Sequence, residues 1–210
     1  MKICILGATG GTGRALIKEA LALHHDIAVL ARTPADLDRF KDRIRIHQGD
    51  VLDPGVLDNI SKGQDAILSA LGVRGTLLGG RKNVSLYSRS SQNIINAMQK
   101  HGVKRFIGVT MSGAEWLPGQ PKIMPVFRFL LKGYMEDILR MESRLEQSSL
   151  DWTVIRPVNL TDSEKTGVYR TWTDRYPPKV FKISRADVAG FMLGCLEDET
   201  TIRKKIGIAY

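Results

Sequence analysis

Short apolar runs alternate with longer amphipathic segments along most of the chain, and this alternation restricts the folds that it can adopt. The runs predict strands at residues 2–6, 26–31, 43–48, 65–70, 105–110 and 152–157, and the segments between them predict helices at 13–23, 34–40, 55–63, 85–102 and 134–148. Strands that alternate with helices pair in parallel through right-handed crossovers. The sequence therefore predicts an α/β fold with a doubly wound parallel sheet and helices on both faces.

The pattern changes after residue 158. Strand-like pieces at 166–172 and 179–184 precede a helix that Ser184 opens, and the apolar run 205–210 follows. We expect residues 158–210 to form a small C-terminal extension on the substrate side, bracing the sheet and contributing to the cleft. No internal repeat or linker divides the sequence, so residues 1–210 are expected to form a single domain.

Glycines crowd the turn after the first predicted strand, in "ILGATGGTGRAL". Gly7, Gly10 and Gly13 have the spacing G-x-x-G-x-x-G, which permits a sharp turn, close approach of a pyrophosphate and tight packing of helix on strand. The helix N-terminus adds unpaired N–H groups and the positive end of a dipole. The alternative is a tight turn without a ligand. The predicted pyrophosphate cradle of this Rossmann-type sheet comprises Gly7, Thr9, Gly10, Gly11, Thr12 and Gly13, of which Gly11 is not required by the motif.

The end of the second predicted strand distinguishes NADP from NAD. A carboxylate there binds the ribose 2′-hydroxyl, whereas an arginine accommodates a 2′-phosphate. Arg32 and Thr33 end this strand, and no Asp or Glu lies between Val29 and Thr33. Together with the N-terminus of the next helix, these two side chains predict an anion site. We therefore expect NADP(H) as the cofactor.

Two more strand ends are expected to face the cofactor, because ligands of such sheets lie beyond the carboxyl ends of the strands. Asp50 and Val51 follow the third strand, and Asp50 is expected either to contact the adenine or to cap the next helix. Ala70, Leu71 and Gly72 end the fourth strand, where small residues let the backbone approach the nicotinamide-side ribose.

Composition restricts the partners. The net charge of +9 favours an anionic partner, with a solvated basic surface as the alternative. Lys and Arg are dispersed without a nucleic-acid-reading motif, and no His or Cys has metal-ligand spacing. No signal pattern opens the sequence, and no apolar run approaches the ~20 residues of a membrane span. We expect a cytoplasmic monomer or homodimer with reduced cysteines and without a metal, membrane or nucleic-acid partner.

Several stretches together resemble the atypical short-chain dehydrogenase/reductase superfamily, in its NAD(P)-binding, NmrA-like branch: "GATGGTG", "GDVLD", "AMQKHGVKRFIGVT" and "DWTVIRP". Within it, "GQDAILSALG", "TGVY" and "ISRADVAGFMLGCL" are most similar to the NADPH-dependent flavin reductase/biliverdin-IXβ reductase group. The resemblance implies a Rossmann-type NAD(P)-binding domain and adds Thr110, Pro157 and Val158 to the expected cofactor contacts.

The catalytic residues depart from the superfamily pattern of Ser, Tyr and Lys, with Tyr-x-x-x-Lys on one helix. Tyr134 is followed four residues later by Ile138, and Lys132 lies on another face of such a helix. Thr110 and Ser112 stand where the Ser is expected, and Met111 stands where the flavin reductase group has Ser. The resemblance therefore implies that Thr110, Ser112 and Tyr134 hydrogen-bond the acceptor or the carboxamide, without a dedicated proton donor.

These observations predict an NADPH-dependent reductase that transfers hydride to a small, flat, conjugated acceptor such as a flavin, a quinone or a biliverdin-like tetrapyrrole. The alternative is a non-catalytic, NmrA-like NADP(H)-sensing regulator, because the Lys is missing. Sugar-nucleotide epimerisation is disfavoured by the broken motif and the short C-terminal region. Candidate walls of the acceptor site are Trp116, Met124, Phe127 and Phe129. Core packing is the alternative for Trp116 and Met124 and the expectation for Phe127 and Phe129. Basic residues expected at the cofactor phosphate or an acidic substrate, if not simply solvated, are Arg74, Arg81 and Lys82.

Overall fold

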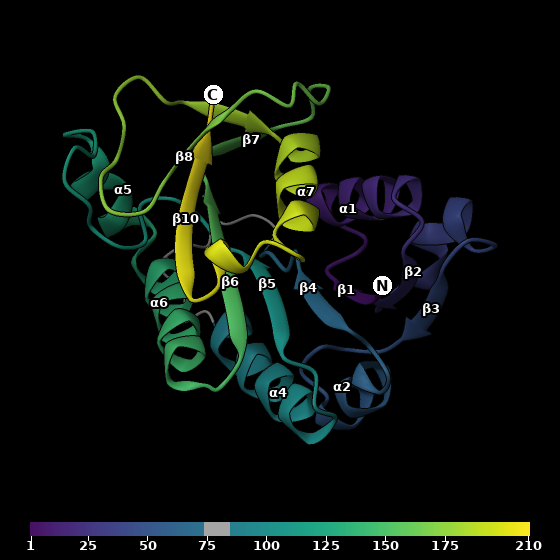
Figure 1. Ribbon diagram of the computed structural model, residues 1–210. Coiled ribbons are helices and arrows are strands. Elements are labelled where there is room, and N and C mark those ends of the chain that lie inside the picture. The colour runs from purple at the N-terminus through teal and green to yellow at the C-terminus, as the bar shows by residue number, and fades with distance from the viewer. Residues whose placement is uncertain (74–84) are drawn as a thin grey trace.

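Apolar runs form an eight-stranded sheet in the computed structural model, which describes residues 1–73 and 85–210 (Figure 1). The strands are β1 (Lys2–Leu6), β2 (Asp26–Ala31), β3 (Arg45–Gln48), β4 (Ala66–Ser69), β5 (Arg105–Val109), β6 (Asp151–Pro157), β7 (Asn159–Thr161), β8 (Arg170–Trp172), β9 (Lys182–Ser184) and β10 (Lys204–Ala209). The helices are α1 (Gly11–Ala22), α2 (Pro54–Ser61), α4 (Leu86–Lys100), α5 (Met124–Leu130), α6 (Lys132–Gln147) and α7 (Arg185–Gly194), with 3₁₀ helices η1 (Pro34–Phe40) and η2 (Glu199–Thr201).

The strand order of the main sheet is β3-β2-β1-β4-β5-β6-β10-β8, and β7 and β9 pair in parallel as a separate two-stranded sheet. Every neighbouring pair from β3 to β10 is parallel, and β8 closes one edge antiparallel to β10. The chain reverses its winding between β1 and β4, and such a switch point is where a doubly wound sheet binds its ligand. The predicted fold class is confirmed.

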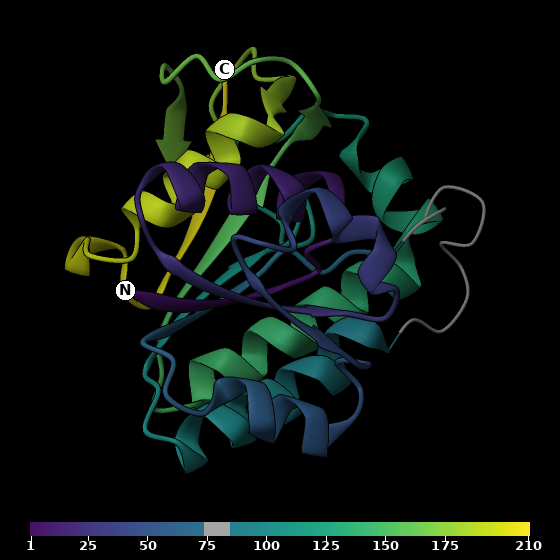
Figure 2. The ribbon, with the colours of Figure 1, turned by 90° about the vertical axis from the view of Figure 1, so that its right-hand side faces the viewer.

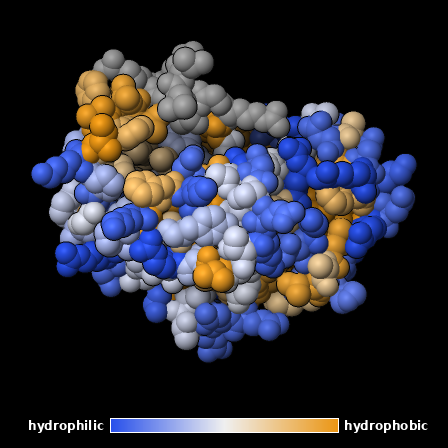
Figure 3. All heavy atoms as spheres, turned by 90° about the horizontal axis from the view of Figure 1, so that it is seen from above, coloured by the Kyte–Doolittle hydropathy of each residue, from blue (hydrophilic) through white to orange (hydrophobic). Residues whose placement is uncertain are grey.

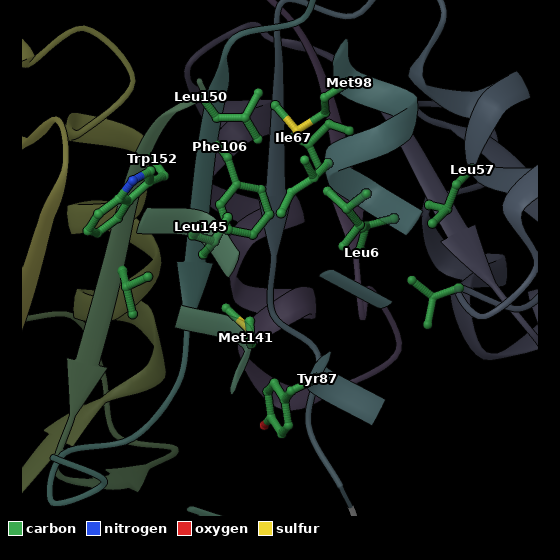
Figure 4. Close-up of a cluster of buried hydrophobic side chains, with 14 of the residues drawn as sticks. Leu6, Leu57, Ile67, Tyr87, Met98, Phe106, Met141, Leu145, Leu150 and Trp152 are labelled. Carbon is green, nitrogen blue, oxygen red and sulfur yellow. The ribbon is translucent and has the colours of Figure 1, made fainter. Parts of the chain in front are cut away.

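Helices cover both faces of the sheet. Helices α1 and α7 lie on one face, and α2, α4 and α6 lie on the other (Figure 2). Successive strand residues point to opposite faces of the sheet. Ile3 and Ile5 therefore pack in a hydrophobic cluster under α1 and α7, whereas Leu6 belongs to a second cluster, under α2, α4 and α6. Figure 4 shows that second cluster, in which Phe106 of β5 lies among side chains from α4 and α6. The carboxyl ends of the strands are thus left as the open edge.

Three elements differ from the sequence-based expectation. The apolar run at the C-terminal end forms β10, which lies inside the main sheet between β6 and β8 and is not merely appended to it. Residues 34–40 form a 3₁₀ helix, the form that short helical segments often adopt. Helix α5 was not predicted, because its sequence MPVFRFL has no polar face to mark a helical period.

Candidate functional site

The glycine loop turns sharply from β1 into α1. Gly7 has a φ of +78°, in the left-handed region that favours glycine, and a Cβ there would lie 2.8 Å from the Leu71 nitrogen. A Cβ on Gly13 would lie 2.7 Å from the Ala8 Cα, so the loop leaves no room for a side chain. The Gly10 N–H donates to the Gly7 carbonyl oxygen over 3.0 Å. Sterics alone therefore require the first and last glycines of the motif.

The N-terminus of α1 is open to a ligand. Gly10 is its N-cap residue, no side chain caps it, and its first turn contains no acidic residue. Thr9 and Gly11 are half-buried here and Thr12 is buried. Unpaired N–H groups and the positive dipole end suit an anion. The cradle thus fits a pyrophosphate, since the glycines leave the space and the helix supplies the donors.

Arg32 and Thr33 are exposed at the carboxyl end of β2. Within residues 1–73 and 85–210, the Arg32 guanidinium makes no hydrogen bond or ion pair. The Gly49 N–H donates to the Ala31 carbonyl oxygen over 3.1 Å, which brings the end of β3 beside this strand end. A free guanidinium is therefore available at the carboxyl end of β2, the edge of the sheet where doubly wound folds bind their ligands.

Asp50 does not cap α2. Its Oδ1 accepts the Leu52 N–H over 2.9 Å and closes a local turn, whereas Asp53 caps the helix by accepting the Gly55 N–H over 2.8 Å. The helix-cap alternative for Asp50 is wrong because the cap position comes three residues later, directly before the proline that opens α2. Val51 is buried in the core.

The chain beyond β4 lies against the glycine loop. The Ala70 N–H donates to the Leu6 carbonyl oxygen over 2.9 Å, and the Leu71 carbonyl oxygen accepts the Tyr87 hydroxyl over 3.2 Å. A Cβ on Gly72 would make only an ordinary contact with Tyr87, at 3.9 Å. The strand ends that predict the two halves of the cofactor site are therefore adjacent. The basic residues Arg74, Arg81 and Lys82 lie outside the described residues.

Tyr134 forms a pair with Tyr87 that the sequence did not indicate. Their hydroxyls lie 2.8 Å apart, and their rings meet edge to face with centroids 5.5 Å apart. Asp137 holds Tyr87 in place, because its carboxylate accepts the N–H groups of Tyr87 and Ser88 at the start of α4. Burial raises the pKa of both phenols, and for Tyr134 the hydrogen bond to Tyr87 offsets this only in part. Both hydroxyls therefore stay protonated at neutral pH.

Thr110 and Ser112 join the ends of β5 and β6. The Thr110 N–H donates to the Ile155 carbonyl oxygen and the Ser112 N–H to the Pro157 carbonyl oxygen, each over 2.9 Å. The Ser112 hydroxyl lies beside the Tyr176 phenol. Burial raises the pKa of Tyr176, and the hydrogen bond with Ser112 offsets this rise only in part. Val158 follows Pro157 and is half-buried. These residues share one strand edge, but the Tyr134 hydroxyl binds Tyr87 and not Thr110.

A buried charge network lies behind Thr110, and sequence reasoning missed it. Arg156 of β6 and Glu142 of α6 are 5% and 1% exposed and form a two-bond ion pair, with 3.1 Å from Nε to Oε1. Thr110 Oγ1 donates to the same Oε1 over 3.2 Å, and Arg156 also binds Glu115 over 2.8 Å. Burial raises the pKa of Glu115, yet Arg156 and Lys205 leave it below its ordinary value. Thr110 therefore faces the network with its hydroxyl.

Helix α5 exposes an apolar surface near this edge. None of its residues is buried, and Phe127 and Phe129 are 43% and 60% exposed. The core packing expected for these two side chains is therefore wrong. Trp116 is exposed as well, and Met124 packs against Gly113 with 2.8 Å between its sulfur and a Cβ built there. Apolar atoms gather over α5 at the upper left of Figure 3.

A hollow of about 280 Å³ lies between α5 and the first turns of α6. Its lining is apolar apart from three charged side chains, and it consists of Ala114, Arg128, Phe129, Lys132, Met135, Glu136 and Leu139. Lys132 is 71% exposed and lies 3.8 Å from Glu136, while Ile138 is fully buried. The lysine that the superfamily motif requires is thus not replaced by Lys132.

A family model described as NAD(P)H-binding matches residues 7–199. The chain belongs to this NAD(P)H-binding family. A member of this family binds a nucleotide cofactor, in agreement with the NAD(P)-binding domain that the sequence resemblance implies. This family member is 26% identical over 221 residues to UPF0659 protein YMR090W of Saccharomyces cerevisiae, covering 99% of the chain and 92% of the relative.

Two solved structures show the fold of this NAD(P)H-binding protein. One is ChuY, an anaerobilin reductase from Escherichia coli O157:H7, with a TM-score of 0.81 and 20% identity, covering 100% of the chain and 97% of ChuY. The other is a short-chain dehydrogenase/reductase from Veillonella parvula in complex with NADP, with a TM-score of 0.80 and 21% identity, covering 100% of the chain and 94% of the relative.

Residues 1–73 and 85–210 contain no group of three or more His, Cys, Asp and Glu side chains arranged to hold a metal ion. The same residues include no helix long and apolar enough to cross a bilayer.

Proposed function

We propose that this protein is an NADPH-dependent reductase of a small, flat, conjugated acceptor such as a flavin, a quinone or a biliverdin-like tetrapyrrole. The observation that carries the cofactor choice is the end of β2, where Arg32 is free and no carboxylate stands between Val29 and Thr33. A carboxylate there would repel a 2′-phosphate, and a free guanidinium binds one through charge-assisted hydrogen bonds.

The residues proposed to hold the cofactor follow the open edge of the sheet. The loop from Gly7 to Gly13 would take the pyrophosphate, Asp50 the adenine, and the backbone at Leu71 the nicotinamide-side ribose. Thr110, Ser112, Pro157 and Val158 would border the nicotinamide half. When bound, NADPH supplies the hydride. The complete reaction consumes NADPH, one proton and the acceptor, and gives NADP⁺ and the two-electron-reduced acceptor.

The proton is proposed to come from water. Tyr134 and Tyr87 hold their protons tightly because burial raises their pKa values, and their hydroxyls already bind each other and the Leu71 carbonyl oxygen. A conjugated ring delocalises the incoming electron pair, so positioning contributes more than acid catalysis. This favours flavins, quinones and tetrapyrroles over simple ketones, whose reduction needs a proton donor at the oxygen.

The exposed aromatic side chains of α5 support a flat apolar acceptor. Phe127 and Phe129 of α5 are exposed, as is Trp116, which precedes α5, and Arg128 and Lys132 line the hollow together with Phe129. A planar acceptor with an acidic substituent suits this combination. ChuY, which shares the fold, is an anaerobilin reductase, and tetrapyrroles of that kind belong in the acceptor panel.

The test is acceptor-dependent NADPH oxidation, followed at 340 nm, with FMN, riboflavin, benzoquinones and biliverdin offered separately. We expect one acceptor class to be reduced, with NADPH preferred over NADH. A protein that binds NADPH tightly but reduces no member of the panel would contradict the proposal.

An NADP(H)-sensing regulator is the second candidate, and one observation favours it. The hydroxyls that would serve catalysis are committed to internal partners, Thr110 to Glu142 and Tyr134 to Tyr87, and buried Ile138 replaces the motif lysine. A protein partner whose affinity differs between the NADPH-bound and NADP⁺-bound forms would support this function.

A further inference from the structure

Arg185 lies against the glycine loop although it is far from it in sequence. It opens α7, which packs beside α1 on one face of the sheet. A Cβ built on Gly11 would lie 2.7 Å from both Cδ and Nε of Arg185. The extra glycine, which the phosphate-binding motif does not require, is therefore the position that makes room for this side chain.

The guanidinium is held, but only at one end. Its Nη1 donates to Asp162 Oδ1 over 2.7 Å, and the Asp162 side chain is 87% exposed. The Nε and the other Nη have no hydrogen-bond partner among residues 1–73 and 85–210. An ion pair this exposed contributes little free energy and exchanges readily for another anion. Asp162 therefore occupies one Nη of Arg185 and leaves the other guanidinium donors available.

The charges around the loop favour an incoming phosphate. The first turn of α1 contains no acidic residue, and its N–H groups are uncapped. Lys165 of the C-terminal segment forms an ion pair with Glu19 of α1 over 2.5 Å, and Glu19 lies beyond the first turn of that helix. Asp162 is thus the carboxylate that Arg185 neutralises beside the open helix end.

We propose that Arg185 binds the pyrophosphate of the dinucleotide, with its planar guanidinium donating to phosphate oxygens while the loop N–H groups bind the others. Asp162 competes with the phosphate for the same guanidinium. This inference rests on the proposed seating of the cofactor on the glycine loop. It assigns a role in cofactor binding to the C-terminal extension, which the loop motif alone does not indicate.

The test is a titration of NADPH, NADH and adenosine 2′-monophosphate against the wild type and five variants. The fragment carries the 2′-phosphate but no pyrophosphate. We expect Arg185→Gln to weaken NADPH and NADH equally, by about tenfold or more, because a charge-assisted hydrogen bond is lost. Its affinity for the fragment should not change. Arg185→Lys should fall between, Asp162→Asn should bind both dinucleotides at least as tightly as the wild type, and Lys165→Gln, the matched control, should bind like the wild type.

Arg32→Ala provides the opposite pattern, with NADPH and the fragment weakened and NADH spared. The inference is overturned if Arg185→Gln binds NADPH like the wild type, or if it loses the fragment in the same proportion as the dinucleotides. Comparing the melting temperature of each variant with that of Lys165→Gln identifies a variant that is merely unfolded. If Arg185→Gln is unfolded, Asp162→Asn still tests the inference, because weaker dinucleotide binding by Asp162→Asn would contradict competition between Asp162 and the phosphate. If the wild type binds neither dinucleotide, the proposed function itself is wrong, and the role of Arg185 is wrong with it.

Discussion

Asp187→Asn tests how the C-terminal extension is held in place. Asp187 is fully buried in the first turn of α7, and its carboxylate accepts hydrogen bonds from the Thr166 and Gly167 N–H groups and from the Ser184 and Tyr210 hydroxyls, at 2.6–3.2 Å. One carboxylate therefore ties the 162–168 segment, the start of α7 and the end of β10 together. Arg185 lies two residues away and depends on the same arrangement.

The magnitude follows from proton linkage. Burial raises the pKa of Asp187, but the hydrogen bonds from Tyr210, Thr166, Gly167 and Ser184 outweigh burial and lower the pKa from 3.8 to about 2. That difference corresponds to about 2 kcal/mol of stability at neutral pH. Because the pKa is lowered in the folded state, this stability is fully present above about pH 5. It declines as the pH falls through 3.8 towards 2 and is absent near pH 1.

Urea unfolding at pH 7 and pH 3 measures this contribution. Asp187→Asn should lose about 2 kcal/mol or more at pH 7, because the amide also has fewer acceptor sites, and its deficit should shrink to about half at pH 3. Asp162→Asn is the matched control, since it removes an exposed carboxylate of the same segment and should change stability by less than about 1 kcal/mol. A deficit for Asp187→Asn that is equal at both pH values would refute the linkage.

The remaining predictions concern the loop, the charge network and the tyrosine pair. Gly13→Ala should abolish measurable NADPH binding, because the new Cβ collides with the loop backbone. Gly63→Ala is the control, since Gly63 has open space around it and a φ of +71°. It should cost about 1 kcal/mol of stability and leave NADPH binding unchanged. Arg156→Met should destabilise the fold by about 3–5 kcal/mol in urea unfolding, because it removes the partner of the buried Glu142 carboxylate. A loss of stability smaller than that of Asp187→Asn would show that water solvates the Arg156–Glu142 pair. Tyr134→Phe should change kcat by less than about tenfold and keep a flat pH profile from 6 to 9, whereas a proton donor would cost about 10²–10⁴-fold.

The periodicity of the sequence was sufficient for the sheet, since each predicted run from β1 to β6 became a parallel strand. Two segments, α5 and β10, lack a periodic pattern that would identify their structure. Helix α5 carries apolar residues on every side, and β10 is a single run whose partner strand no local signal names. Tertiary pairing decides β10, and α5 lacks the polar stripe that marks a helix, so local patterns predict neither element.

The predicted site residues were those whose roles depend on backbone position, such as the glycines and the strand ends. Tyr87 escaped notice because its partner Tyr134 is 47 residues away and on another helix. The Arg156–Glu142 pair did leave a signal. Arg156 interrupts a buried strand, and Glu142 lies four residues after Ile138 and three before Leu145, on the apolar stripe of α6. A charge on each of two buried surfaces predicts an ion pair, because lone buried charges are rare.

A calorimetric titration of NADPH and NADH against the wild type and Arg32→Asp measures directly whether Arg32 selects the cofactor. The free guanidinium at the end of β2 predicts that the wild type binds NADPH at least about tenfold more tightly than NADH. Arg32→Asp should reverse that preference, because its carboxylate repels the 2′-phosphate and accepts a 2′-hydroxyl. A wild type that binds both dinucleotides equally, or a variant that keeps the preference for NADPH, would contradict the account.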